Sequence, residues 1–224
     1  TFIANRATYD GGGLWMGFLP YPTPEGEFYK LSNLTFIRNK AGDGGGLYIR
    51  YGSFSLGEVG DLKFIKNIAS DKGGGMYLYQ SRGSYDNIEF IENSAKLGGG
   101  AYPEGNAIYF HNSTFTRNNA TQEGGGLYIP GFKVGTTNCL FNENTAGKGA
   151  AIMSRDRETC AYTNTTFHAN VATNSGAVLY ISVEDSQANY TFTNCLIYGN
   201  TANEIPNAFG LSSTSALGNY DISY

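Results

Sequence analysis

The sequence predicts an all-β protein: a single-stranded, right-handed parallel β-helix, or β-solenoid, of about eight coils with three short strands in each. Three observations predict it. The phrase F-x-x-N returns along the whole chain, glycine runs follow most copies of it, and apolar and polar residues alternate on both sides of it. Copies of roughly 25 residues bury an inner face only by stacking on their neighbours, which is the parallel solenoid arrangement. We therefore expect one domain over residues 1–224.

The repeat is exact enough to number. We call the first residue of F-x-x-N the phase position, and the phase positions are Phe2, Phe36, Phe64, Phe90, Phe115, Phe141, Phe167 and Ile197. They are 34, 28, 26, 25, 26, 26 and 30 residues apart. Asn follows three residues after every phase position and Ala five residues after it. The same rule predicts a partial ninth copy with its phase position at Ile222, preceded by Leu217 and Asn219.

The strands follow from alternation around these positions. Residues two before the phase position, such as Leu34, Leu62 and Ile88, alternate with charged residues such as Lys63 and Glu89. After the glycines, Leu47-Tyr48-Ile49 has the in, out, in pattern of a strand, and the other copies repeat it. The β-branched, aromatic and Gly-rich composition of the repeats is also unfavourable for an α-helix.

The repeated asparagines and glycines have structural explanations. Stacked coils place equivalent residues about 4.8 Å apart, so an Asn can pair its amide with the same Asn above and below. We expect an asparagine ladder at a corner, where Asn also tolerates positive φ. Its members are Asn5, Asn39, Asn67, Asn93, Asn118, Asn144, Asn170 and Asn200. The Gly-Gly-Gly runs allow unusual φ and close backbone approach, and they lack the Lys-Ser/Thr of a phosphate loop.

Composition restricts the function classes. The 224 residues are 41% hydrophobic and only 15% charged, with 31 glycines and 17 tyrosines, which favours an extracellular β protein. The net charge of -4 gives no indication of nucleic-acid or anionic-membrane binding. No apolar run approaches the roughly 18 residues that a membrane-spanning helix needs.

The coupled pattern F-x-x-N and Gly-Gly-[Ala/Gly]-[Ile/Leu] resembles the repeats of the chlamydial polymorphic outer membrane proteins and of similar surface proteins. The resemblance extends from Phe2 to about Gly210, although this chain prefers Gly-Gly-Gly-Leu-Tyr. It implies a right-handed parallel β-helix. Members of that family are mostly adhesins, autotransporter passengers and large cell-surface proteins, whose repeated residues are structural.

Other right-handed β-helices are polysaccharide lyases and hydrolases, which need convergent carboxylates. The best cluster here is Glu58, Asp61, Asp86 and Glu89, with Lys63 and Arg82 nearby in sequence. We expect a solvated surface with weak charge pairs rather than a catalytic site. A polysaccharide-active enzyme remains the alternative function.

No metal or cofactor site is expected. Asp10, Asp43 and Asp71 precede the glycines in three coils only, whereas a calcium repeat would keep its acids throughout. His111 and His168 have no serine or acid arranged around them, so we expect surface histidines. Cys139 and Cys195 share an inward position two coils apart, about 10 Å, which exceeds disulfide reach of about 7 Å. Together with Cys160 they are expected to be free thiols.

Two surface features stay open. The outward aromatic residues should form a stripe that either contacts a ligand or neighbouring chain or is covered by loops. We call it the tyrosine stripe: Trp15, Tyr48, Tyr77, Tyr102, Tyr128 and Tyr180, with Met153 interrupting it. Five sequons are possible glycosylation sites, of which Asn119 and Asn189 are better candidates than Asn33, Asn112 and Asn164 at the corners.

The sequence as a whole predicts a non-catalytic structural protein, located outside the cell or on its surface. It would be a solenoid segment of an adhesin, fibre or filament. The expected partners are further coils of a longer chain or copies of itself stacked end to end, with glycans or host and cell-surface molecules as possible ligands. Head-to-tail stacking that does not close would give an open filament.

Overall fold

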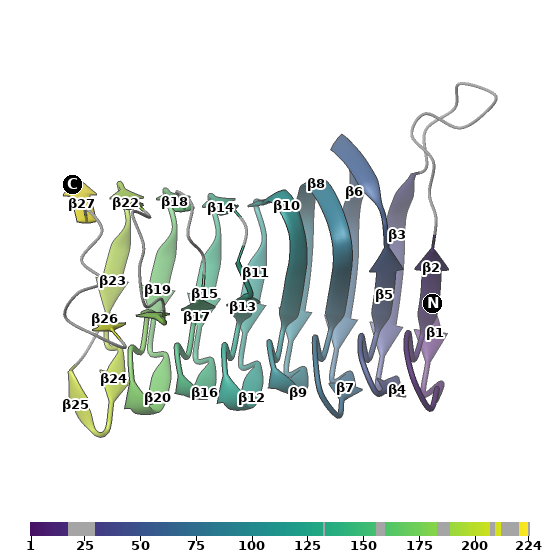
Figure 1. The fold of residues 1–224 in the computed structure, drawn as a ribbon, viewed down its shortest axis with the longest axis horizontal. Coiled ribbons are helices and arrows are strands. Elements are labelled where there is room, and N and C mark those ends of the chain that lie inside the picture. The colour runs from purple at the N-terminus through teal and green to yellow at the C-terminus, as the bar shows by residue number, and fades with distance from the viewer. Residues whose placement is uncertain are drawn as a thin grey trace.

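The protein is an all-β parallel solenoid, as predicted, and a computed structural model describes residues 1–17, 30–131, 133–155, 160–182, 189–206, 209–211 and 220–223. Figure 1 shows the coils in chain order along one axis, with the same elements repeating from coil to coil. About six complete turns lie between Phe36 and Ile197. The predicted coils on either side include residues 18–29 and 212–219, which lie outside the described residues.

The phase positions pair in one continuous parallel ladder. Phe36 lies opposite Phe64, Phe64 opposite Phe90, and Phe90 opposite Phe115, and the same register joins the remaining positions. The strands that carry the phase positions are β1 (Phe2–Ile3), β3 (Leu31–Ile37), β6 (Ser53–Ile65), β8 (Met76–Ile91), β11 (Thr114–Thr116), β15 (Leu140–Asn142), β19 (Thr166–His168) and β23 (Leu196–Tyr198).

A second ladder contains the strands that follow the glycines, and it pairs Leu47 with Met76 and Tyr48 with Tyr77. Besides part of β8, its members are β2 (Leu14–Gly17), β5 (Leu47–Arg50), β10 (Ala101–His111), β13 (Leu127–Ile129), β17 (Ile152–Ser154), β21 (Leu179–Ile181) and β26 (Phe209–Leu211).

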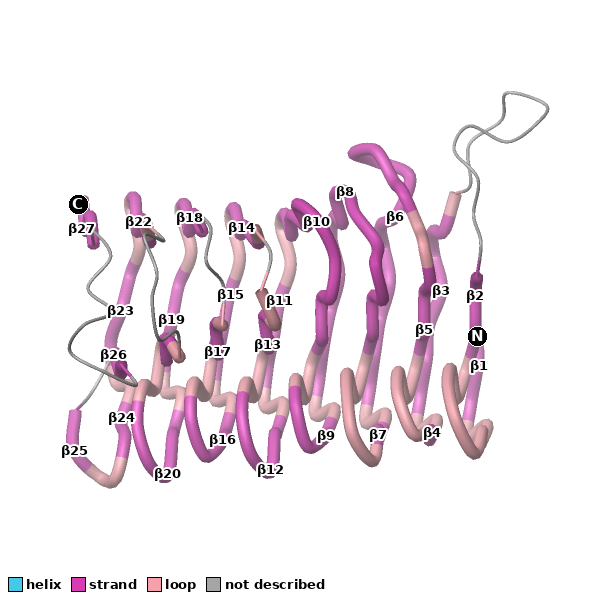
Figure 2. The backbone as a smooth tube through the Cα atoms, in the orientation of Figure 1, coloured by secondary structure: helices cyan, strands magenta, loops and turns pink. Residues whose placement is uncertain are grey.

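Three strands per coil were predicted, but in the later coils the segment before the phase strand forms a strand of its own. These strands are β14 (Val134–Thr137), β18 (Cys160–Thr163), β22 (Tyr190–Thr193) and β27 (Tyr220–Ser223). The break falls at an Asn with positive φ, for example Asn138 at 56°. Later coils therefore contain four strands rather than three, whereas in β8 the same segments run on without a break. Figure 2 shows this change from long to short strands along the solenoid.

A smaller eight-stranded sheet follows the ladder asparagines. Its strands are β4 (Lys40–Ala41), β7 (Ile68–Ala69), β9 (Ser94–Leu97), β12 (Asn119–Glu123), β16 (Thr145–Lys148), β20 (Val171–Ser175), β24 (Thr201–Ala202) and β25 (Ile205–Pro206). The repeated alanines, among them Ala120, Ala146 and Ala172, pack beneath this sheet in a small core of their own. Small side chains suit this turn because the chain reverses tightly there.

The predicted ninth copy was placed wrongly. Strand β27 pairs with β22 so that Ile222 lies opposite Phe192, which is five residues before the phase position Ile197. Ile222 therefore occupies the position before a corner and not a phase position. Leu217 and Asn219 lie outside the described residues. The hydrophobic spacing misled the prediction because both positions point into the core and take the same residue types.

Candidate functional site

The asparagines three residues after each phase position form a continuous hydrogen-bonded ladder in the interior. The Nδ2 of Asn93 donates to Oδ1 of Asn118 at 3.0 Å and to the carbonyl of Phe64 at 2.8 Å. Its own Oδ1 accepts from Nδ2 of Asn67 at 3.0 Å and from the Asn67 backbone N–H at 2.9 Å. Both amide hydrogens and both acceptor positions are therefore used. The same contacts recur from Asn5 to Asn200, and Asn39 through Asn170 are fully buried.

The reason given for Asn at this corner needs correction. Positive φ does not fall on the ladder asparagine but on the residue before it, for example Arg38 at 53°, Lys66 at 55° and Glu92 at 53°. Asn is required there for its side-chain amide, which closes the ladder. A different row of residues, three before each phase position, uses the left-handed tolerance of Asn and Asp, including Asn87 at 50° and Asn112 at 50°.

The phase phenylalanines stack above the ladder. Phe90 and Phe115 have ring centroids 4.6 Å apart with planes 13° from parallel, and Phe115 and Phe141 are 4.6 Å apart at 1°. Glycine is used beside this stack. A Cβ on Gly100 would lie 2.6 Å from the carbonyl oxygen of Gly126 and 3.1 Å from Cδ1 of Phe115. The glycine run thus lets the next strand approach the phenylalanine stack.

The tyrosine stripe is covered and is not a free surface. Tyr48, Tyr77, Tyr102, Tyr128 and Tyr180 are at most 6% exposed and Met153 is fully buried, while Trp15 in the first coil is 49% exposed. Residues just before the glycines fold back over the rings: Lys72 Nζ lies 5.5 Å from the Tyr102 centroid and Lys148 Nζ 5.0 Å from that of Tyr180. The Tyr77 hydroxyl donates to Glu104 at 2.5 Å. Of the two alternatives for the tyrosine stripe, a contact surface or a face covered by the chain itself, the structure contains the covered face.

Burial changes the titration of the covered rings. Desolvation raises the pKa of Tyr48 and of Tyr128 to about 12. For Tyr77 desolvation and the hydrogen bond to Glu104 raise the pKa further. These phenols stay neutral at any physiological pH and act as packing groups.

The predicted carboxylate cluster is only partly assembled. Asp61, Lys63 and Glu89 line a surface hollow of about 320 Å³ together with Asn33, Thr35 and Asn87. Lys63 Nζ contacts Glu89 at 2.7 Å, and Asn87 Nδ2 donates to Asp61 at 2.7 Å. Asp86 instead accepts from Asn112 at 2.7 Å, and neither Glu58 nor Arg82 lines this hollow. Neighbouring coils thus pair these acids with cations and amides.

The remaining candidate residues lie apart from one another. His168 Nδ1 is 2.7 Å from Asn142 Oδ1, and its ring stacks on Tyr198 at 4.3 Å. His111 lies in a different coil from His168, and its ring stacks on Tyr109 of the same strand, β10. In the described part of the chain no three His, Cys, Asp or Glu residues are grouped as metal ligands would be.

The acids before the glycines are perturbed rather than clustered. Asp10 pairs with Asp43 through a backbone bridge, and burial raises the pKa of both carboxyls. Asp43 also accepts a hydrogen bond from the Lys72 backbone N–H at 3.0 Å. Asp71 instead forms an exposed ion pair with Lys96 at 3.8 Å.

All three cysteines are free thiols. The Cys139 Sγ lies 3.4 Å from the carbonyls of Phe110 and Thr137, which share its single proton, and burial raises its pKa to about 11. Ser113 and Thr165 occupy the same position in neighbouring coils and make equivalent bonds to His111 and Thr163. The earlier coils carry Leu34, Leu62 and Ile88 at this position, so a small donor occupies it only from Ser113 onward.

The sequon asparagines differ in accessibility. Asn33, Asn112 and Asn164 are exposed corner residues, and the amides of Asn112 and Asn164 donate to Asp86 and Asn138. Asn119 is exposed on β12, where its Oδ1 accepts from the Thr145 hydroxyl at 2.7 Å. Asn189 is half-buried and its carbonyl accepts from the Cys160 backbone N–H.

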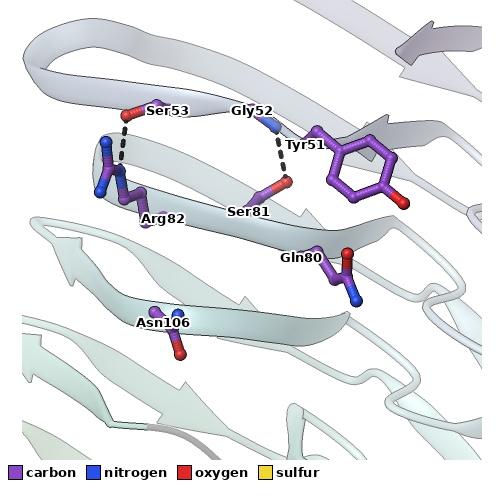
Figure 3. A pocket seen from close by; sticks show the side chains of 7 residues that line it. All are labelled: Tyr51, Gly52, Ser53, Gln80, Ser81, Arg82 and Asn106. Atoms are coloured by element: carbon purple, nitrogen blue, oxygen red, sulfur yellow. Dashed lines mark hydrogen bonds between the residues drawn. The ribbon is translucent and has the colours of Figure 1, made fainter. Parts of the chain in front are cut away.

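A second hollow was not predicted from the sequence. It has a volume of about 340 Å³ and lies where three successive coils turn from the second ladder toward the next phase strand. We call it the corner hollow, and its lining residues are Tyr51, Gly52, Ser53, Gln80, Ser81, Arg82 and Asn106 (Figure 3). Sequence reasoning missed it because these residues fall in the stretch of variable length between repeats.

The fold and the stacked interior define a class of protein: a parallel β-solenoid whose repeated residues contact one another between coils. Within that class, two of the repeats match the polymorphic membrane protein type. A family model for the Chlamydia polymorphic membrane protein (Chlamydia_PMP) repeat matches residues 33–50 and 138–155. Each match spans a corner Asn, a phase Phe and a ladder Asn, followed by Gly44-Gly45-Gly46 in the first match and Gly149-Ala150-Ala151 in the second. This repeat type belongs to surface or outer-membrane proteins. No curated protein and no solved structure matches the chain.

Proposed function

We propose that this chain is a non-catalytic β-solenoid segment of a cell-surface protein of the adhesin or fibre kind. One observation carries the proposal: the residues that recur in every coil are those of the surface-protein repeat, and all are engaged in holding one coil on the next. Asn93 uses its whole amide in this way. A scaffold of this construction holds its outer loops at fixed spacing, as an extended display surface requires.

The first and last described coils expose apolar residues to which further coils could be added. In the first coil Phe2, Leu14 and Met16 are half-buried, whereas their counterparts Phe36, Leu47 and Ile49 are fully buried. Ile197 and Phe209 are likewise only partly buried at the other end. Further coils, from the same chain or from another copy, would cover these faces. Light scattering of the isolated chain checks self-stacking, and a dilution-insensitive monomer would contradict it.

The surface location is tested on intact cells. Antibodies raised against the purified chain should bind cells that express it without permeabilisation, and mild protease treatment of those cells should remove the signal. An antibody against an internal protein, which binds only after permeabilisation, is the control. Detection of the chain only in permeabilised cells would overturn the proposal. In the described residues no helix is long and apolar enough to cross a membrane.

A further inference from the structure

The corner hollow is shaped by irregularities in an otherwise regular ladder. Between β8 and β10 the pairing passes from Tyr79–Glu104 directly to Ser81–Gly105, which leaves Gln80 without an opposite residue. The next shift, between Gly105 and Ile108, leaves Asn106 outside the register as well. Such bulges redirect side chains out of the regular alternation.

The backbone at this corner is held in unusual conformations. Tyr51 has φ of 60°, Gln80 of 46° and Ala107 of 53°. Gly105 allows the two coils to meet, because a Cβ there would collide with the Ser81 carbonyl. The Ser81 hydroxyl is fully used: it accepts from the Gly52 N–H at 3.1 Å and donates to the Tyr79 carbonyl at 3.1 Å. The floor of the hollow is therefore rigid.

The walls, in contrast, present groups that the protein does not use itself. Gln80 and Asn106 are exposed, and neither carboxamide has a hydrogen-bond partner among the described residues. Arg82 donates from Nε to the Ser53 hydroxyl at 2.9 Å, which fixes the guanidinium while leaving its Nη groups available. Figure 3 shows Arg82 at one end of the hollow and Tyr51 at the other, with Gln80 and Asn106 on neighbouring strands.

The charge and shape of the hollow select a ligand class. Arg82 is its single charged lining residue, so one negative charge is complementary to it. Carboxamides both donate and accept hydrogen bonds, which suits sugar hydroxyl groups. The volume of about 340 Å³ is at the small end of ligand sites. We propose that the corner hollow binds one carboxylate-bearing sugar residue of the hexuronate kind, as part of a glycan.

In this arrangement the sugar carboxylate pairs with the Arg82 guanidinium, and the sugar hydroxyls bond to Gln80 and Asn106. The inference rests on the proposed surface function and supplies its ligand class. It is tested on the purified chain in solution, whereas the surface location is tested on cells, so either can fail without the other.

The experiment is an NMR titration of the labelled chain with methyl glucuronoside, methyl glucoside and acetate. Methyl glucuronoside should shift the side-chain amide signals of Gln80 and Asn106 and the backbone signals of residues 51–53 and 80–82. Methyl glucoside should bind about tenfold more weakly or worse, because it lacks the charge-assisted bond. Acetate alone should produce only slight shifts, because it makes none of the hydroxyl contacts.

Two variants localise the interaction. Arg82→Gln should remove the preference for the acidic sugar, and Gln80→Ala should weaken the binding of both sugars. Arg38→Gln changes an exposed arginine at a different corner and should bind as the unaltered chain does. Circular dichroism confirms that each variant is folded. Equal binding of the two sugars, equal shifts with acetate, shifts elsewhere on the chain, or an equal loss in Arg38→Gln would each overturn the proposal.

Discussion

Replacing Asn93 by Ala tests whether the asparagine ladder stabilises the solenoid. The substitution removes four hydrogen bonds, two donated by Nδ2 to Asn118 and Phe64 and two accepted by Oδ1 from Asn67. The backbone N–H of residue 93 keeps its bond to Asn118 Oδ1, because that bond does not involve the lost side chain. The damage is therefore directional and falls on the Asn67 side.

The magnitude follows from the groups left behind. Asn67 is fully buried, and its backbone N–H and one amide hydrogen lose their acceptor. Each buried polar group without a partner costs about 1–3 kcal/mol, so the two Asn67 donors together should cost roughly 2–6 kcal/mol of unfolding free energy. Its other amide hydrogen still donates to the Phe36 carbonyl at 2.9 Å, which keeps the loss from being larger.

Denaturant unfolding followed by circular dichroism measures the loss, with Asn174→Ala as the matched control. Asn174 is exposed on β20, so its replacement should change stability by no more than about 0.5 kcal/mol. Solenoids can unfold locally, so amide hydrogen exchange supplies the second readout. The Asn67 N–H should lose protection, whereas the Asn118 N–H, bonded to Asn144 Oδ1, should keep it. An unchanged midpoint, or equal loss of protection in both directions, would refute the reasoning.

Three further predictions concern the glycine turn, the covered tyrosines and the buried thiol of Cys139. Gly98→Ala should cost about 2 kcal/mol in denaturant unfolding, because φ is 65° there and a Cβ would lie 2.5 Å from the Ala101 carbonyl; a neutral result would contradict this. Raising the pH from about 10 to about 12 should destabilise the fold, because buried Tyr48 and Tyr128 have raised pKa values and therefore ionise first in the unfolded chain. The stability that these neutral phenols contribute is complete below a pH of about 10 and is lost as the pH rises through about 12. Thermal unfolding against pH measures this, and Tyr128→Phe should flatten the curve; tyrosines that titrate near 10 without loss of structure would contradict it. Cys139→Ser should change stability by less than about 1 kcal/mol, because Ser113 makes the equivalent bond in the preceding coil, and a large shift of the unfolding midpoint would show that the sulfur packs in a way serine does not.

Much of the fold could be predicted because a solenoid converts sequence spacing directly into spatial register. Phe64, Phe90 and Phe115 lie opposite one another because each coil adds one strand spacing to the same ladder. Asn67 and Asn93 meet for the same reason. The ninth copy was misplaced because an apolar residue near an Asn occurs both at the phase position and five residues before it, and Ile222 lies in register with Phe192 at the earlier position.

Local patterns were less informative about the candidate sites. Asp61 and Glu89 were grouped from the sequence and do line one hollow, but the sequence does not reveal that Asn87 and Lys63 pair with them. The corner hollow depends on unpaired residues such as Gln80 and Asn106, which lie where repeat lengths vary and carry no signature.

The sequence by itself determined the repeat, the parallel stacking and the identity of the ladder residues, because these depend only on which residues recur at fixed spacing. The tertiary structure alone decided what lies against the outward faces. Alternation correctly placed Tyr48, Tyr102 and Tyr128 outside the main core, yet all three are buried. Long side chains lie over the rings, with Lys72 over Tyr102 and Arg155 over Tyr128. A period of two states which side of a strand a residue occupies, and only the path of the chain beyond that strand determines whether water or protein covers it.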